Sequence, residues 1–395
     1  MRTNRFTQIS CVFNILLMAI GSLILSERPG TCQSPPQKGD SSKFSGWDKN
    51  GDGFLTRDEF PERFPSGLFD RIDADKDGKV SRTEDDAYRA ANQSRRQQNQ
   101  GRQRQNPPRQ TPGAQQRENR NSNALDGAQI DRDIIYEKVG ERSLPLDLDR
   151  PSGTDGVTPL VIWIHGGGWR GGSKKSPGPA AEMLKRGYAV ASVEYRLSGE
   201  AIFPAAIEDC KAAVSFLRLN ADKYNLDPKK FGVWGSSAGG HLVALLGTTN
   251  DVKLFDTHPV TKKASSAVQA VCDWFGPTDF LRMNDFKGSI DHDGANSPES
   301  LFIGGPIQAN EAKSQRANPI HYVTASDPPM LLMHGDKDAL VPYNQSELLY
   351  EALQKAGVKS TIYKVKNGGH GFRGADESRE DLIDRSANFL DSVLK

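Results

Sequence analysis

Three kinds of side chain in the later part of the sequence could together carry out nucleophilic acyl transfer. Ser237 stands in the pentapeptide Gly-Ser-Ser-Ala-Gly over residues 235–239. Asp336 and Asp338 follow an apolar run, and His370 stands between glycines close to the C-terminus. A serine hydroxyl becomes a good nucleophile when an imidazole takes its proton, and a carboxylate holds that imidazole in the right tautomer. The side chains needed to cleave an ester or an amide through an acyl-enzyme are therefore present.

The local sequence favours Ser237 as the nucleophile. The frame Gly-x-Ser-x-Gly fits Ser237, whereas Ser236 would require glycine where Trp234 stands. Small residues on both sides of the serine let the backbone bend sharply enough to lift the hydroxyl clear of a sheet. A helical pattern begins immediately afterwards, and its first N–H groups would face an anion formed at the serine.

A glycine-rich loop could supply the backbone N–H groups that catalysis by this serine needs. The sequence His-Gly-Gly-Gly-Trp at residues 165–169 follows an apolar run that ends at Ile164. Successive glycines free the backbone to present N–H groups to a developing oxyanion, and the N–H of Ala238 would approach it from the other side. The loop and the serine turn together predict a site for a tetrahedral intermediate.

With these two motifs, residues 131–395 resemble the α/β-hydrolase superfamily. Within it, the chain is similar to microbial carboxylesterases with an HGGGW loop, which are related to hormone-sensitive lipase and to bacterial feruloyl and acetyl-xylan esterases. The resemblance implies that the oxyanion hole is formed by Gly167, Gly168 and Ala238. It also implies a serine esterase activity that needs no cofactor for catalysis.

The resemblance selects the other two members of a catalytic triad. The family pattern of His-Gly, two further residues and an acid before Val-Pro picks Asp338, and Asp336 is interpreted as a turn or capping residue. The chain order Ser237, Asp338, His370 is the order expected of this fold. His241 stands four residues after the serine and competes for the role of base. Because no carboxylate stands behind it, we interpret it as a packing or capping histidine.

The elements that must position these residues alternate along the chain. Continuous apolar runs, as in buried parallel strands, alternate with helical patterns, and this alternation favours a mostly parallel sheet with helices on both faces. The expected strands are 134–136, 144–148, 160–164, 188–193, 231–234, 268–274, 330–333 and 360–365, and the expected helices are 180–186, 205–219 and 380–394. Residues 281–327 lie where such enzymes place lids and acyl pockets, and their shape is not readable from the sequence.

Two twelve-residue stretches near the N-terminus resemble the calcium-binding loops of EF-hand proteins. Each has oxygen-bearing side chains at positions 1, 3, 5, 9 and 12, glycine at position 6, and a backbone carbonyl at position 7. Carboxylates this close repel one another unless a hard cation neutralises them, and calcium is the natural occupant. The expected ligands are Asp48, Asn50, Asp52, Phe54, Thr56 and Glu59 in the first loop, and Asp73, Asp75, Asp77, Lys79, Ser81 and Glu84 in the second.

The segment around these loops departs from a full EF-hand pair. The helix before the first loop would be short, and Pro61 and Pro65 interrupt the segment between the loops. Apolar residues there would supply a shared core, namely Phe60, Phe64, Leu68, Phe69 and Ile72. We therefore expect calcium to fold residues 41–90 in a structural role and to leave the chemistry unchanged.

Composition divides the chain into four parts. Residues 1–30 have an apolar run after Arg2 and Arg5, which predicts an export signal or a membrane anchor. An EF-hand-like pair follows at 41–90, then a Gln- and Arg-rich linker at 91–129 that is too polar to bury a core, and a catalytic domain at 130–395. Overall, 51 Lys and Arg balance 50 Asp and Glu, so no nucleic-acid partner is expected. The basic linker leaves contact with an acidic polysaccharide open.

The sequence thus predicts an α/β protein, an α/β-hydrolase with a small N-terminal EF-hand-like α segment. Its expected function is an exported serine carboxylesterase that hydrolyses short-chain or carbohydrate-linked esters. Two alternatives remain: a serine peptidase of the same fold, and a secreted binding protein that has lost catalysis. Cys210 and Cys272 are interpreted as small buried side chains.

Overall fold

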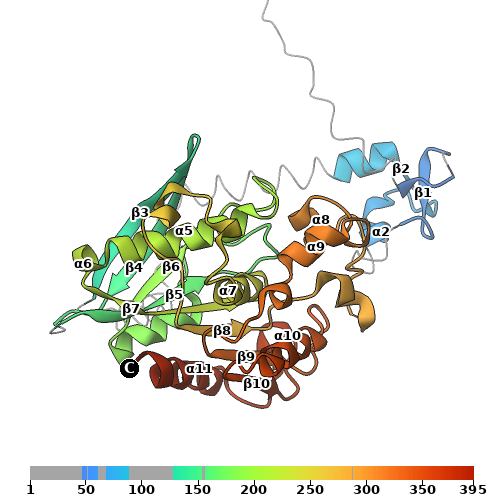
Figure 1. Cartoon of the computed structure of the whole chain (residues 1–395). Coiled ribbons are helices and arrows are strands. Elements are labelled where there is room, and N and C mark those ends of the chain that lie inside the picture. Colours follow the sequence, from blue (N-terminus) through green and yellow to red (C-terminus); the bar gives the residue numbers. More distant parts are fainter. Residues whose placement is uncertain (1–46, 51, 61–67, 89–127, 154–155, 287) are drawn as a thin grey trace, which may run out of the picture. The chain divides into compact units, whose positions relative to one another are not determined.

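The computed structural model describes residues 47–50, 52–60, 68–88, 128–153, 156–286 and 288–395. These residues fall into two compact units, divided between Gln110 and Thr111, and each unit is described by itself (Figure 1). The predicted export segment lies outside the described residues, as does the predicted linker up to residue 127. Its last residue, Gln129, already belongs to a strand, because it pairs with Arg150. Among the described residues, no helix combines the length and apolar character that a bilayer span requires.

The N-terminal unit joins the two acidic loops through a small sheet. Strands β1 (Phe54–Thr56) and β2 (Lys79–Ser81) pair antiparallel, with Leu55 opposite Val80. These two residues occupy position 8 of their loops, and they pack with Phe69 and Ile72 of α2 (Leu68–Ile72) in a buried cluster. The predicted core is therefore found in part, while Phe64 and both interrupting prolines lie outside the described residues.

An eight-stranded sheet forms the centre of the second unit, in the order β10-β9-β8-β7-β5-β6-β4-β3. Only the pairs β3–β4 and β4–β6 are antiparallel, so the predicted mostly parallel sheet is confirmed. Its strands are β3 (Gln129–Val139), β4 (Arg142–Arg150), β5 (Thr158–Ile164), β6 (Ala189–Val193), β7 (Leu226–Ser236), β8 (Ala270–Trp274), β9 (Met330–Gly335) and β10 (Ser360–Val365).

Helices cover both faces of this sheet (Figure 1). Alternate residues of β5 show the division, since Ile162 packs into one apolar cluster and Val161 into the other. On the Ile162 side lie α5 (Ala205–Leu219), α7 (Ala238–Thr248) and α10 (Asn344–Lys355). On the Val161 side lie the 3₁₀ helix η1 (Gly178–Arg186) and α11 (Arg379–Leu394).

Short elements fill the remainder of the unit. The helical pattern expected at 180–186 is a 3₁₀ helix rather than an α-helix, and it ends at Gly187, whose φ is 83°. Cys210 and Cys272 are free and buried. The remaining short elements are α6 (Ala221–Tyr224), η2 (Lys253–Phe255), η3 (Pro259–Lys262), η4 (Phe280–Asp285), α8 (Pro298–Ile303), η5 (Ile307–Ala309), α9 (Glu311–Ala317), η6 (Pro319–Tyr322) and η7 (His370–Phe372).

Candidate active site

Ser237 sits on a strained turn between β7 and α7. Its φ of 55° and ψ of −124° are values that a side chain other than glycine rarely adopts. The two glycines of the pentapeptide are required by space. A methyl group on Gly235 would lie 2.3 Å from the carbonyl oxygen of Gly239, and one on Gly239 would lie 2.1 Å from that of Ile164. Close backbone approach therefore explains the Gly-x-Ser-x-Gly frame.

The structure brings the three predicted triad residues into one hydrogen-bonded chain. Nε2 of His370 lies 3.1 Å from Oγ of Ser237, and Nδ1 of the same ring lies 2.8 Å from Oδ2 of Asp338. Each residue follows the carboxyl end of a different strand, β7, β9 or β10. Parallel strands β7 to β10 point these ends to one edge of the sheet, which is how residues distant in sequence meet.

Asp338 is held as an ionised carboxylate. Its Oδ1 accepts hydrogen bonds from the backbone N–H groups of Leu340 and Val341, both at 2.9 Å. Burial alone would raise the pKa of this carboxyl, but the neighbouring imidazoles of His334 and His370 outweigh burial and hold its pKa well below the ordinary range. The carboxylate can therefore orient the imidazole of His370 and stabilise it when it becomes charged.

His334 is a neighbour of the triad that the sequence did not reveal. Its Nε2 lies 3.5 Å from Oδ2 of Asp338 and 2.9 Å from the carbonyl oxygen of Val341. Its Nδ1 lies 2.7 Å from Oγ of Ser346. The ring is fully buried, so these contacts fix the loop that presents Asp338.

The predicted oxyanion residues lie beside the serine. Gly167 and Gly168 have φ values of 112° and 61°, and both line the cavity that Ser237, Ala238 and His370 also line. A methyl group on Gly167 would lie 2.3 Å from the carbonyl oxygen of Gly171. Only glycine fits this backbone path, which leaves main-chain atoms at the cavity surface.

The segment after β6 anchors the glycine loop at both ends. The hydroxyl of Tyr195 donates to the carbonyl oxygen of His165 at 2.9 Å, and the N–H of Ser198 donates to that of Trp169 at 2.7 Å. The ring of His165 stacks on Tyr195 with a centroid distance of 4.3 Å. These contacts hold the glycine loop in place.

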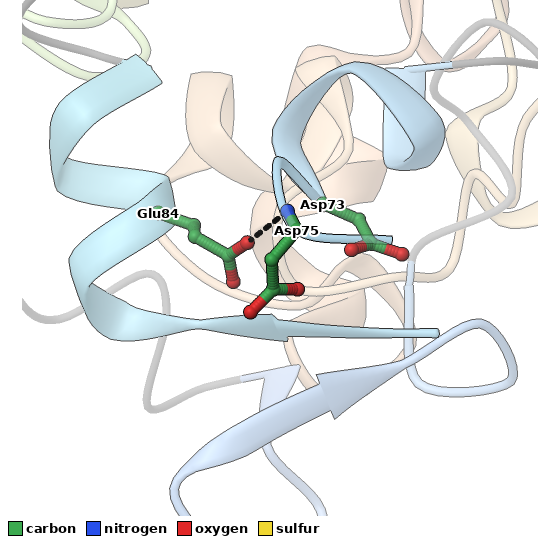
Figure 2. A group of neighbouring side chains, drawn as sticks. All are labelled: Asp73, Asp75 and Glu84. Atoms are coloured by element: carbon green, nitrogen blue, oxygen red, sulfur yellow. Dashed lines mark hydrogen bonds between the residues drawn. The ribbon is translucent and has the colours of Figure 1, made fainter. Parts of the chain in front are cut away.

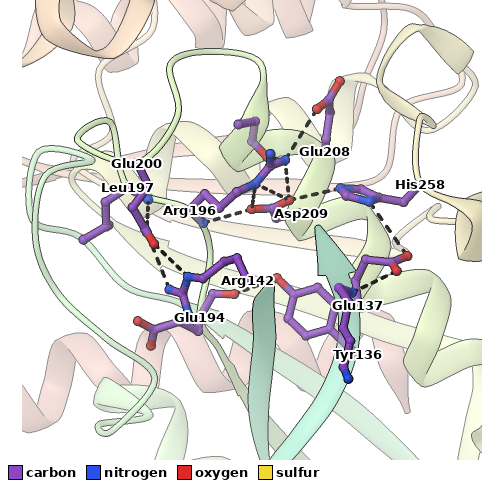
Figure 3. Close-up of polar contacts among 12 residues, drawn as sticks. Tyr136, Glu137, Arg142, Glu194, Arg196, Leu197, Glu200, Glu208, Asp209 and His258 are labelled. Carbon is purple, nitrogen blue, oxygen red and sulfur yellow. Dashed lines mark hydrogen bonds and ion pairs between the residues drawn. The ribbon is translucent and has the colours of Figure 1, made fainter. Parts of the chain in front are cut away.

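A network of charged groups holds that supporting segment in turn (Figure 3). Arg196 makes a bidentate pair with the fully buried Asp209 of α5, from Nε to Oδ2 at 2.9 Å and from Nη2 to Oδ1 at 2.7 Å. Nε2 of His258 lies 3.0 Å from Oδ1 of the same aspartate, and Tyr136 of β3 donates to the carbonyl oxygen of Glu194 at 2.6 Å. Because each buried charge is paired, the network can fix the backbone between Glu194 and Arg196.

Asp273 supports the serine turn from the neighbouring strand. Its Oδ1 accepts a hydrogen bond from the N–H of Gly276 at 2.9 Å, and a methyl group on Gly240 would lie only 2.2 Å from that oxygen. Burial raises the pKa of Asp273 to about 7. This carboxyl therefore packs against the start of α7.

The two competitors named from the sequence lie in other surroundings. Asp336 occupies the turn after β9, where its N–H donates to the carbonyl oxygen of Val365 at 3.0 Å. His241 is fully buried among aromatic rings, and its Nε2 lies 2.7 Å from the carbonyl oxygen of Ala317. Burial lowers the pKa of His241 to about 4. The interpretation of His241 as a packing residue fits this position.

A cavity of about 900 Å³ opens over the serine and the histidine. Its lining includes apolar side chains such as Trp163, Pro179 and Trp274. Residues 290–292 and 294–299 also line it and bring several polar side chains, and this segment is called the polar wall below. A cavity of this size accommodates a small organic ester.

The acidic loops of the N-terminal unit fit a hard cation. In the second loop, one carboxylate oxygen each of Asp73, Asp75 and Glu84 lie within 4.8 Å of one another (Figure 2). Oδ1 of Asp73 is buried without a hydrogen-bond partner among the described residues. Hydrogen bonds from the backbone and hydroxyl of Ser81 lower the pKa of Glu84 and keep it charged. An orphaned oxygen inside a cluster of carboxylates is what a bound cation would satisfy.

The first loop has the same local geometry. Oε1 of Glu59 accepts from the N–H groups of Lys49 and Asn50, both at 3.2 Å, as Oε1 of Glu84 accepts from Ala74 and Asp75. The position 6 glycines, Gly53 and Gly78, both have a φ of 85°. The other predicted ligands lie in the same two loops. Phe54 and Lys79, which occupy position 7, are the first residues of the paired strands β1 and β2.

Two family profiles match the chain. The BD-FAE profile matches residues 146–353, more than half of the chain, and the EF hand profile matches residues 47–64 and 67–84. The esterase LipQ of Mycobacterium tuberculosis is 31% identical over 257 residues, which is 64% of this chain and 59% of that protein. The probable carboxylic ester hydrolase LipM of the same organism is 29% identical over 239 residues, 59% of this chain and 54% of that protein. The chain therefore spans somewhat more than half the length of these relatives.

Solved structures share the fold. A truncated form of a carbohydrate esterase from gut microbiota is 33% identical, with a TM-score of 0.59, and the match covers 67% of this chain and 96% of that chain. The esterase Est2 of the Planctomycetes species Thermogutta terrifontis is 24% identical, with a TM-score of 0.52, and the match covers 68% of this chain and 91% of that one. The predicted α/β-hydrolase architecture is confirmed by these neighbours.

Proposed function

The chain belongs to the BD-FAE family of α/β-hydrolases, and from this premise we propose that it is a serine carboxylesterase acting through Ser237, His370 and Asp338. The observation that carries the proposal is the hydrogen-bonded chain from Oγ of Ser237 through His370 to Asp338, with contacts of 3.1 Å and 2.8 Å. These are the distances that proton transfer from a serine to an imidazole requires.

The geometry supports acyl transfer in two steps. Nε2 of His370 takes the proton of Ser237 as Oγ attacks the carbonyl carbon of the ester, and the carbonyl oxygen becomes an oxyanion. Backbone N–H groups of Gly167, Gly168 and Ala238 stabilise that charge. His370 then returns the proton to the departing alcohol, which leaves an acyl group on Ser237. Water, deprotonated by the same ring, attacks the acyl carbon, and the acid is released as Oγ regains its proton.

We place the substrate among short-chain or carbohydrate-linked esters. The cavity of about 900 Å³ is lined by both apolar and polar side chains, which suits a small acyl group attached to a hydrophilic alcohol. The likeness to a carbohydrate esterase at 33% identity points the same way. A serine peptidase of the same fold and a non-catalytic binding protein are the alternatives that the experiment below must exclude.

Calcium binding and export complete the proposal. The EF hand match and the Asp73, Asp75 and Glu84 cluster support a structural calcium site that takes no part in catalysis. Export rests on the apolar run within residues 1–30, which lies outside the described residues.

The test is a substrate screen with a nucleophile variant. Wild type should hydrolyse p-nitrophenyl acetate and butyrate faster than octanoate, should act on acetylated xylan or feruloyl esters, and should leave an aminoacyl anilide intact. Ser237→Ala should lower kcat by several orders of magnitude. Ser392→Ala, on the exposed side of α11, is the matched control and should be unchanged. Full activity in Ser237→Ala would reassign the nucleophile, and cleavage of the anilide alone would favour the peptidase.

A further inference from the structure

A carboxylate and an imidazole meet in the wall of the cavity above Ser237. Nδ1 of His292 lies 3.1 Å from Oε2 of Glu299, and the two side chains are only 1% and 4% exposed. Both residues line the cavity. Two polar groups withdrawn from water in this way are unfavourable unless hydrogen bonds replace the lost solvent. The pair therefore needs an explanation that packing does not give.

The pair has hydrogen-bonding capacity that the described protein does not use. Neither ring nitrogen of His292 has a hydrogen-bond partner among the described residues, and neither does Oε2 of Glu299, so the 3.1 Å approach lacks the alignment of a hydrogen bond. His334, which is equally buried, uses both of its ring nitrogens. Unpaired buried polar atoms beside a reaction site are typical of groups that pair with a ligand.

The pair lies next to the reacting centre. Glu299 directly follows Pro298, whose Cβ is 3.5 Å from the position that a methyl group on Gly168 would occupy. The wall itself is held by its own hydrogen bonds. The N–H of His292 donates to Oδ1 of Asn284 at 3.0 Å, and Oγ of Ser297 accepts from the N–H of Ser300 at 3.0 Å. The polar wall is therefore built in place beside the proposed oxyanion loop.

We propose that His292 and Glu299 bind a hydroxyl group on the alcohol part of the ester and so select polyol or carbohydrate esters. A hydroxyl is both a donor and an acceptor. Oε2 of Glu299 and the ring nitrogens of His292 have almost no accessible surface, so a small side-chain rotation must first turn them to the cavity. The hydroxyl can then donate to that oxygen and accept from an N–H of His292, which satisfies both members of the pair at once. A substrate without that hydroxyl leaves the two groups buried and unpaired, and sites of this kind reject such analogues strongly.

The lining of the cavity suits both ends of the ester. An ester that reacts at Ser237 extends in two directions from its carbonyl carbon, toward the acyl group and toward the alcohol. Trp163, Pro179 and Trp274 offer an apolar surface suited to a small acyl group. With the hydroxyl-bearing alcohol against His292 and Glu299, this apolar surface is left for the acyl group. This inference rests on the proposed esterase function.

The experiment removes the hydroxyl from the substrate and the pair from the protein. A monoacetylated methyl xyloside with free hydroxyl groups is compared with the same ester in which those hydroxyls are O-methylated, and p-nitrophenyl acetate serves as a third substrate. The variants are Glu299→Gln and His292→Asn. His321→Asn is the matched control, because His321 is exposed and does not line the cavity.

Wild type should prefer the free xyloside ester over its methylated form by about tenfold or more in kcat/KM, mainly through KM. Both variants should lose that preference, because their kcat/KM for the free xyloside ester should fall toward the value for its methylated form. The control should behave as wild type. Circular dichroism melting establishes that each variant is folded.

Other results overturn the inference. An equal loss on all three substrates would assign the pair a purely structural role, and a wild type that treats the two xylosides alike would show that no hydroxyl is recognised. If a variant does not fold, the comparison of the two xylosides in wild type still decides whether a hydroxyl group is recognised. A wild type that cleaves no ester would refute the esterase proposal instead. The role of the pair would then be decided by measuring, with saturation-transfer NMR, how wild type and Glu299→Gln bind methyl xyloside.

Discussion

Replacement of Asp338 by asparagine isolates the orienting role of the carboxylate with little change in shape. The new side chain keeps an oxygen that can accept from the N–H groups of Leu340 and Val341. It places an NH₂ group where Oδ2 now lies 2.8 Å from Nδ1 of His370. Two donors cannot face each other, so the imidazole must carry its proton on Nε2. In that tautomer Nε2 points a hydrogen at Ser237 and cannot accept the serine proton.

The expected loss follows from this tautomer. In serine hydrolases the same change lowers kcat by about 10⁴-fold, or about 5.5 kcal/mol of transition-state stabilisation, while the geometry stays intact. KM should change little, because Asp338 is buried behind the ring of His370. The variant should also lose stability. Since the pKa of Asp338 is lowered in the folded protein, its ionised form stabilises the fold above the ordinary carboxyl pKa, and this contribution disappears as pH falls.

The assay is steady-state hydrolysis of p-nitrophenyl acetate, with active sites counted by an acylating inhibitor. Asp336→Asn is the matched control, since the same substitution two residues earlier falls in the turn after β9 and should leave kcat within about twofold of wild type. The reasoning is refuted if Asp338→Asn keeps more than about a tenth of wild-type kcat, or if Asp336→Asn loses as much.

Three further predictions follow from packing, charge and burial. Gly239→Ala should abolish turnover and lower Tm, because its methyl group would lie 2.1 Å from a backbone oxygen. The control Gly199→Ala meets nothing within 4 Å and should change neither turnover nor Tm, and an active, stable Gly239→Ala would disprove the packing argument. Glu84→Gln should weaken calcium binding by about tenfold or more in calorimetry and leave esterase kcat unchanged, and a matching loss of kcat would tie calcium to catalysis. His241 has a pKa of about 4 against an ordinary 6.5, so the unfolded chain takes up its proton first as pH falls. The free energy of unfolding should therefore drop by up to about 3 kcal/mol between pH 6.5 and 4 in urea titrations, and His241→Gln should flatten that drop.

The sequence could locate Ser237, the glycine loop and His370 because their chemistry is local. Each depends on small residues beside a strand end, and such signals lie within a few positions of the residue itself. The assignment of Asp338 over Asp336 needed the family pattern, since both follow β9 closely. Strand positions were also readable, because the buried strands are continuous apolar runs. The exact ends were less so, and β3 extends from Gln129 to Val139, well beyond the expected 134–136.

The residues that the sequence did not reveal depend on side-chain contacts that no local pattern marks. His334 gains its meaning from Ser346, which is twelve positions away, and from the oxygens of the intervening loop. His292 and Glu299 belong to a loop held by side-chain hydrogen bonds, from the N–H of His292 to Asn284 and from the N–H of Ser300 to Ser297. No hydrophobic pattern marks such a loop, so neither its shape nor the pair inside it could be predicted.

The turn at Ser237 sets folding against chemistry at one position. With a φ of 55°, the backbone there is one that glycine would occupy more comfortably than serine, by roughly 1 kcal/mol. A mutant library screened for thermal stability alone should therefore enrich glycine at position 237 and give proteins that are more stable but inactive. Directed evolution of a more stable variant must therefore also select for catalytic activity in every round.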